Sequence, residues 1–240
     1  MFYNKPVAID RVTHRDLRMK FLAKGYSYAA KTNSVPLASV EFSTACHEYP
    51  IVFVTDEQGG GIPLALTGLR DSENLFVNAE GQWDAAYIPA FVRRYPFVLQ
   101  GSQDSEQFSV LIDSEADGFG AEDGERLFTE DGADSEMLTN VVNLLDSFRT
   151  YTAQTNELVK LLIKLDLLIP RMVNVTNQKG ETFTLDGFSV VDEERLNALS
   201  DADLLGLARN GALAAIYAHL MSLPNIQKVM ARLERILPEA

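Results

Sequence analysis

The segment Tyr49–Leu69, YPIVFVTDEQGGGIPLALTGL, decides the fold of this chain. Its two apolar runs, Tyr49–Thr55 and Ile62–Leu69, are rich in Val, Ile and Leu, as is typical of β-strands. Between them lies DEQGGG at 56–61, where three glycines can adopt the positive φ values that a hairpin connection requires. The segment therefore predicts a β-hairpin.

The sequence around this hairpin, from Val35 to Ile112, continues in short apolar runs bounded by Gly, Pro and Asp. Leu75–Val77 and Phe108–Asp113 are predicted to be further strands. Pro89–Tyr95 is predicted to be a short helix, because proline is favoured at the first helical position and Pro96 prevents continuation.

The pattern changes to helical spacing after residue 133. Asp134 or Ser135 can cap a helix that continues, broken or unbroken, to Leu168. Phe183–Val191 returns to the character of a strand, with Gly187 at a bend or bulge.

Helices resume in the last fifth of the chain. Asp192 and Ser200 are predicted helix starts, and Pro224 separates the helix before it from a final segment, Gln227–Leu237. Together these patterns predict an α+β fold. A mainly antiparallel β-region, 1–136, ends in an acidic loop and packs as one unit with a mainly helical region, 137–240.

The charge is strongly acidic and unevenly distributed. The formal net charge is −13, and Gly101–Glu136 contains twelve acidic residues but only one basic residue, Arg126. This block is predicted to contain solvated, mobile surface loop. Nucleic acid is excluded as a partner, because phosphate binding needs clustered Lys and Arg.

The N-terminus and the cysteine content indicate a cytoplasmic protein. The first residues, MFYNKPVAIDRVTHRD, have no apolar core of a secretory signal, and no apolar stretch is long enough for a transmembrane segment. Cys46 is the only cysteine, so an intrachain disulfide is impossible. The alternative is a cell-surface location reached by a leaderless route.

The usual catalytic and cofactor motifs are absent from the sequence. It contains neither a P-loop nor a dinucleotide-binding glycine motif, so no cofactor and no catalytic residue is predicted. Cys46 and His47 are expected to be neighbours on an extended strand, where their side chains point apart. Asp113–Gly118 resembles half of an EF-hand loop, but Gly124 occupies the position of the closing glutamate, so no metal site is predicted.

The stretch Gly81–Phe97, GQWDAAYIPAFVRRYPF, holds the candidate binding residues. It combines the only tryptophan with other aromatic residues and adjacent arginines, a composition enriched at recognition surfaces. The alternative is that the aromatic residues pack in the core and the arginines pair with carboxylates. On a short helix one arginine should pack and the other should face solvent. The predicted contacts with a partner are Trp83, Tyr87, Arg93, Arg94 and Tyr95.

Several motifs together resemble the bacterial SapC family, named after a protein associated with a surface layer. They are Glu41-Phe42, YPIVF from Tyr49, LFV from Leu75, GQW from Gly81, YIPAFVRRYPF from Tyr87 and NGALAAIYAHLMSL from Asn210. The similarity extends from about Pro36 to Leu223. It implies a family but transfers no catalytic residue.

Three functions are compatible with these observations. The missing catalytic motifs and the aromatic–arginine stretch favour an accessory protein that binds a protein or peptide partner. The family name suggests a structural component of the surface layer or envelope. An enzyme of unrecognised type is the third, and the oligomeric state is left open.

Overall fold

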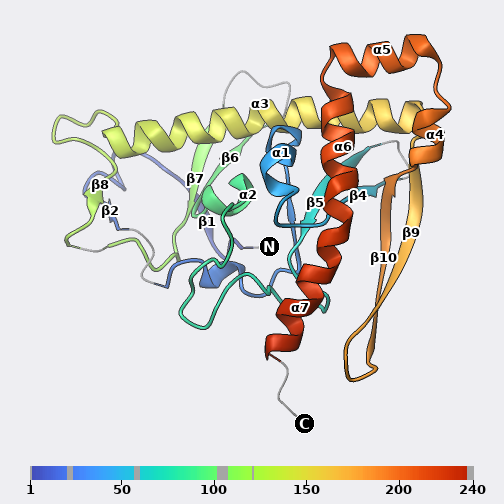
Figure 1. Cartoon of the computed structure of the whole chain (residues 1–240). Coiled ribbons are helices and arrows are strands. Elements are labelled where there is room, and N and C mark those ends of the chain that lie inside the picture. Colours follow the sequence, from blue (N-terminus) through green and yellow to red (C-terminus); the bar gives the residue numbers. More distant parts are fainter. Residues whose placement is uncertain (1, 21–23, 57–59, 102–107, 121, 237–240) are drawn as a thin grey trace. The chain divides into compact units, whose positions relative to one another are not determined.

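The structure is a computed structural model, which describes all residues except 1, 21–23, 57–59, 102–107, 121 and 237–240 (Figure 1). Contacts group the chain into two units, each built from separate segments. Unit 1 comprises Met1–Ala29, Val77–Trp83 and Ala90–Thr150; unit 2 comprises Ala30–Phe76, Asp84–Pro89 and Tyr151–Ala240. The fold class is α+β, as predicted, with antiparallel sheets and mostly C-terminal helices. That a β-rich region, 1–136, and a helical region, 137–240, pack as one compact unit stays a prediction.

Unit 1 contains an antiparallel sheet of three short strands in the order β1-β7-β6: Pro6–Ala8, Ser109–Asp113 and Phe97–Gln100. A second strand pair joins β2, Arg18–Met19, to β8, Glu125–Arg126. The short helices are η1, Ser27–Ala29, and α2, Ala90–Arg93. The core of the unit contains Phe97, Ile112, Leu127, Phe128, Leu138 and Leu145.

The acidic segment Gly101–Glu136 is therefore more than a surface loop. It provides β7, which confirms the strand predicted at Phe108–Asp113, and β8, and its apolar residues Ile112, Leu127 and Phe128 are buried in the core of unit 1. Of the predicted loop, residues 102–107 and 121 lie outside the described part of the chain. The acidic composition identified a charged segment here. It did not show that apolar residues between the charges, such as Leu127 and Phe128, are part of the core.

The long helix α3, Glu136–Lys164, confirms the helix predicted after residue 133. The Ser135 hydroxyl accepts a hydrogen bond from the Leu138 amide at 3.2 Å, as an N-cap does. The helix is continuous because its sequence contains no Gly or Pro. It ends before Leu168, since Asp166 adopts a φ of 55° and turns the chain into the next strand.

Unit 2 is built on a five-stranded antiparallel sheet in the order β3-β5-β4-β10-β9. The predicted hairpin is confirmed: β4, Ile51–Thr55, pairs with β5, Gly61–Leu66, from Ile51 opposite Ala65 to Thr55 opposite Gly61. The short strand β3, Ser34–Pro36, pairs with the other edge of β5. The strand predicted at Leu75–Val77 is wrong, because Leu75 and Phe76 lie in a turn and Val77 forms only a single bridge to Trp83.

The other half of this sheet comes from the C-terminal part of the chain. β10, Thr182–Val191, confirms the strand predicted there, and Gly187 lies in its bulge with a φ of 75°. Its partner β9, Leu168–Thr176, was not predicted, because the helical pattern was extended to Leu168 and Pro170 argues against a central strand. β9 is the last strand of the sheet, where proline is tolerated.

Short helices surround the sheet of unit 2. Between β3 and β4, the short helix η2, Ser39–Glu41, leads into α1, Phe42–Ala45. Asp192 and Ser200 cap the helices predicted to start there, α4, Glu193–Asn197, and α5, Asp201–Arg209. A chain of three helices then follows across the sheet (Figure 1): α6, Ala212–Ser222, η3, Leu223–Asn225, and α7, Ile226–Ile236.

Buried polar side chains fasten these last helices to the sheet. The imidazole of His219 lies between β4 and β10: Nδ1 is 2.8 Å from the Ile51 carbonyl oxygen, and Nε2 accepts a hydrogen bond from the Val191 amide at 3.0 Å. The imidazole therefore bridges Ile51 and Val191, in place of a direct backbone hydrogen bond between β4 and β10, where the two strands separate. His219 is completely buried.

Ser222 and Asn225 make comparable contacts one turn further on. The Ser222 hydroxyl accepts a hydrogen bond from the Ile51 amide at 2.9 Å, and the Asn225 amide donates to the carbonyl oxygens of Cys46 and Tyr49. These bonds fix the position of α6 and η3 beside β4. No helix among the described residues is both long and apolar enough to cross a bilayer.

Candidate functional site

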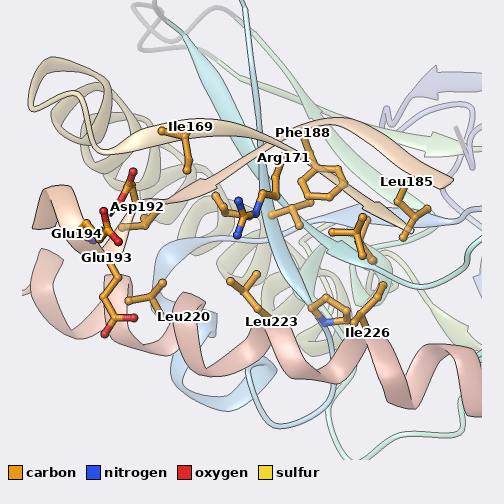
Figure 2. A pocket seen from close by; sticks show the side chains of 16 residues that line it. Ile169, Arg171, Leu185, Phe188, Asp192, Glu193, Glu194, Leu220, Leu223 and Ile226 are labelled. Carbon is orange, nitrogen blue, oxygen red and sulfur yellow. Dashed lines mark hydrogen bonds between the residues drawn. The ribbon is translucent and has the colours of Figure 1, made fainter. Parts of the chain in front are cut away.

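A groove of about 630 Å³ lies between one face of the unit 2 sheet and the helices α6, η3 and α7 (Figure 2). We call it the sheet groove. Every lining residue belongs to unit 2. The lining consists of Pro50, Val52, Leu66, Ile169, Arg171, Val173, Leu185, Phe188, Val190, Val191, Asp192, Glu193, Glu194, Leu220, Leu223 and Ile226.

Strand register explains why the floor of the groove is apolar. Residues opposite one another in an antiparallel pair project from the same face of a sheet. Phe188 lies opposite Arg171 and Val190 opposite Ile169, so β9 and β10 present these side chains on one face. Val52, Phe188 and Val190 are buried under the helices, whereas Ile169, Leu66, Val173 and Leu185 are only half-buried. The helices therefore leave part of an apolar sheet face open.

Arg171 is the one basic side chain in the lining of the groove. In Figure 2 it lies between the acidic residues at one end and Phe188 and Leu185 at the other. It is exposed, and within the described part of the chain its guanidinium has no hydrogen bond or ion pair. An unpaired guanidinium on an apolar floor is suited to a carboxylate, which it can bind through two parallel hydrogen bonds.

Three acidic residues line the opposite end of the groove, where β10 passes into α4. Asp192 is already engaged, since its carboxylate caps α4 and lies 3.6 Å from the Arg195 guanidinium. Glu193 and Glu194 are exposed, and their carboxylates have no ion pair within the described residues. The groove thus has separate positive and negative positions.

The apolar floor extends beyond the groove across the sheet. A smaller cavity of about 170 Å³ shares Val52, Leu66, Leu185 and Phe188 with the groove and continues to Leu64. This continuation contains one charged side chain, Asp186. A ligand that binds Arg171 can therefore extend across apolar surface toward Leu64.

A larger cavity, of about 870 Å³, lies elsewhere in unit 2 among α1, α3 and α6. Its one charged lining side chain, Glu157, is already paired with Lys160 at 2.8 Å. Much of the rest is Ala, Gly and Ser. Among the described residues, this lining offers no unpaired charged side chain to a ligand, in contrast to the sheet groove.

The structure does not gather the five predicted binding residues at one site within a unit. Trp83, Arg93, Arg94 and Tyr95 belong to unit 1, whereas Tyr87 belongs to unit 2. Their role in binding a partner stays a prediction.

Two of them pack in the aromatic interior of unit 1. Trp83 is 9% exposed and meets the Tyr26 ring edge to face at 5.8 Å. Tyr95 stacks on Tyr28, with ring centroids 4.0 Å apart, and its hydroxyl donates a hydrogen bond to Asp113. Its pKa is raised, mainly by burial and also by the negative charge of Asp113. These contacts give both residues a structural role.

The adjacent arginines have different environments, as predicted for a short helix. Arg93 is exposed, whereas the Arg94 guanidinium lies over the rings of Phe91 and Phe148, at 4.2 and 4.6 Å from their centroids. Burial lowers the pKa of Arg94, and the neighbouring Tyr3 opposes that effect. The prediction that the packed arginine pairs with a carboxylate is wrong. Among the described residues, the Arg94 guanidinium contacts aromatic rings instead.

Tyr87 contributes to the interior of unit 2. Its hydroxyl donates to Glu41 at 2.7 Å, and its carbonyl oxygen accepts a hydrogen bond from the Tyr49 hydroxyl. Glu41 is itself buried and accepts a hydrogen bond from the Ala38 amide. The Glu41, Tyr49 and Tyr87 positions in the sequence motifs thus meet in one structural network.

Cys46 and Asp113 also have structural surroundings. Cys46 follows the last residue of α1 rather than lying on a strand, so the expected extended conformation is wrong. Burial raises the pKa of its thiol. Asp113 accepts hydrogen bonds from the amides of Asn4 and Lys5, and these and other bonds outweigh burial and lower its pKa. The first position of the EF-hand-like segment is therefore occupied by contacts within the protein.

Arg171, Glu193 and Glu194 were not singled out from the sequence. Ile169, Arg171 and Val173 alternate with Pro170 and Met172 in LIPRMVNVT, which is the available signal for a strand with one mixed face. That face meets Phe188 and Leu223 only through tertiary packing. A local pattern could have identified the strand but not the groove.

Comparison with known proteins identifies the family. The SapC family model matches residues 9–229, which is most of the chain and includes the sheet groove and the aromatic–arginine stretch. No curated protein and no solved structure matches the chain. The chain belongs to the SapC family.

Proposed function

We propose that this protein is a peptide-binding accessory protein whose sheet groove holds an extended segment of a partner polypeptide. The observation that carries this proposal is Arg171, a cation without a partner among the described residues, on an open apolar face of a protein with a net charge of −13. A partner with apolar side chains and a carboxylate complements that surface.

The dimensions of the groove support this occupant. A volume of about 630 Å³ is within the range of sites that bury ligands of drug or short-peptide size. Its floor lies along two strands, so apolar side chains at alternate positions of an extended peptide can follow it. The single cysteine and its burial favour action in the reducing cytoplasm.

Arg93 supports a second proposed contact with the partner. It is exposed and ends α2 in a chain with few basic residues. Its guanidinium suits an acidic side chain of a partner protein. Trp83, Arg94 and Tyr95 would then act through their packing within unit 1 rather than by touching the partner.

A blocking substitution tests the proposed function. Val173 is half-buried at the edge of the groove, so Val173→Trp should fill it with little cost to folding. We expect a pool of nine-residue peptides with alternating apolar and polar positions to be retained by the immobilised protein and not by Val173→Trp. Val12→Trp, on a residue that is 89% exposed in unit 1, is the matched control and should retain the peptides. Equal retention by all three proteins, or none, contradicts the proposal.

A further inference from the structure

We infer that the sheet groove recognises the free N-terminus of a polypeptide with an acidic residue near its third position and apolar residues after it. This inference rests on the proposed function and specifies its ligand. It assigns the ammonium group to Glu193 and Glu194, the acidic side chain to Arg171, and the apolar residues to the floor near Leu185 and Phe188.

The first step is the order of charges along the groove. Val191, the last residue of β10, pairs with Leu168, and Asp192 separates Val191 from Glu193 and Glu194, the first two residues of α4. Arg171 lies three residues beyond Leu168 along β9. Because a strand rises about 3.3 Å per residue, Leu168, at the acidic end of the groove, is separated from Arg171 by about 10 Å of sheet.

The second step matches that spacing to a peptide. In an extended chain the first and third residues are two steps, about 7 Å, apart, and a glutamate side chain at the third position can cover the remaining distance of roughly 3 Å. An N-terminal ammonium at the glutamates therefore brings the side chain of the third residue to Arg171. Residues one, three, five and seven of the peptide project from the same face, toward the floor of the groove.

The third step decides between the two ends of a peptide. A peptide that ends with its C-terminal carboxylate at Arg171 can cover the apolar floor on one side of it, but it leaves Glu193 and Glu194 without a contact. That floor continues past Phe188 and Leu185 to Leu64 in the smaller cavity. A chain that starts at the glutamates and continues past Arg171 covers both the charged positions and this apolar surface.

The test uses a labelled peptide of defined sequence, Ala-Ser-Glu-Ser-Leu-Ser-Val-Ser-Lys, with fluorescein on the lysine. Two matched peptides carry one change each: an acetylated N-terminus, or Gln in place of Glu at the third position. Fluorescence anisotropy gives Kd for each peptide with the native protein, Arg171→Gln, and the double variant Glu193→Gln, Glu194→Gln. Arg209→Gln and Asp201→Asn are controls at exposed positions of α5 outside the groove.

We expect each change to the peptide to raise Kd by about tenfold or more with the native protein. The effects should be paired. The Gln peptide should bind the native protein and Arg171→Gln equally, and the acetylated peptide should not distinguish the native protein from the double glutamine variant. The α5 controls should behave as the native protein does.

The outcomes separate this inference from the proposed function. If all three peptides bind equally and Val173→Trp abolishes their binding, the groove binds peptides but does not read these charges, and the inference is overturned. If the changes weaken binding without the expected pairing, the assignment to Arg171 and the glutamates is also wrong. If none of the three peptides binds saturably, while the mixed pool is retained, the inference fails alone; if the pool is not retained either, the proposed function fails with it.

Discussion

His219 is the side chain through which α6 holds β4 and β10 together. Its Nε2 must be unprotonated to accept the hydrogen bond from the Val191 amide, so the neutral ring with a proton on Nδ1 is the form that fits. Burial lowers the pKa of His219 to about 4. The native contacts and the pKa therefore agree on a neutral imidazole.

Stability should depend on pH through this residue. The unfolded chain binds a proton at His219 below a pH of about 6.5, whereas the folded chain resists it down to about 4. Lowering the pH between these values therefore favours unfolding, by up to about 3 kcal/mol in total. Urea unfolding at pH 7, 5.5 and 4.5 should show this loss.

His219→Gln separates this effect from the titration of carboxylates. The variant should be less stable than the native protein at pH 7, but the gap should narrow toward pH 4.5. His47→Gln, at an exposed histidine, should keep the native pH dependence. An identical pH dependence in the native protein and His219→Gln would show that His219 does not titrate as its surroundings imply.

Arg93 and Arg94 should differ in their contribution to stability. Arg94→Ala removes a guanidinium packed on two phenylalanine rings and should lower the free energy of unfolding by about 1 to 3 kcal/mol. Arg93→Ala, at an exposed position, should change it by less than about 1 kcal/mol. Thermal unfolding of both variants measures the difference. Equal losses would contradict the assignment of Arg94 as the packed residue.

At the scale of elements, the bulge in β10 depends on Gly187. Its φ of 75° is strained for any side chain, although a Cβ would meet no atom within 4 Å. Gly187→Ala should therefore destabilise the protein by about 1 kcal/mol through backbone strain alone. Gly206→Ala is the matched control, because Gly206 is equally open but lies within α5.

The control should change stability in the opposite direction. Alanine in a helix is favoured over glycine, so Gly206→Ala should raise the free energy of unfolding by about 0.4 to 1 kcal/mol. Chemical denaturation of the two variants gives the signs directly. Destabilisation by both, to the same extent, would mean that the bulge conformation of Gly187 is not the cause.

The elements that were predicted correctly are those with local determinants. The β4–β5 hairpin follows from apolar runs around a glycine-rich turn, and the starts of α4 and α5 follow from Asp192 and Ser200. The start of α3 likewise follows from Ser135. Each of these signals operates within a few residues of the element that it defines.

The parts that were missed depend on contacts between distant segments. β9 is a strand because β10 pairs with it, and its Pro170 made the pattern unfavourable when considered alone. The joint between β4 and β10 needs an imidazole from α6. The sheet groove likewise exists only where β9, β10 and η3 meet, so Arg171 could not be recognised as a site residue from its neighbours in sequence.

In the molecule as a whole, the proposed binding site lies in unit 2, and the aromatic side chains of the Gly81–Phe97 stretch have mainly structural contacts. Arg171 supplies attraction for a carboxylate within an otherwise acidic chain. The many acidic residues of the protein should repel partners that carry much negative charge in addition to the one carboxylate that binds Arg171. The two candidate surfaces lie in different units, so one titration can distinguish them.

That measurement is an NMR titration of methyl-labelled and tryptophan-labelled protein with the unmodified nine-residue peptide. We predict saturable shifts of groove methyls from Val52, Val173, Leu185 and Leu223, with the Trp83 indole and the Leu138 methyls unchanged. Saturable shifts confined to Trp83 and its neighbours in unit 1, with the groove methyls unmoved, would contradict the central claim that the sheet groove is the binding site.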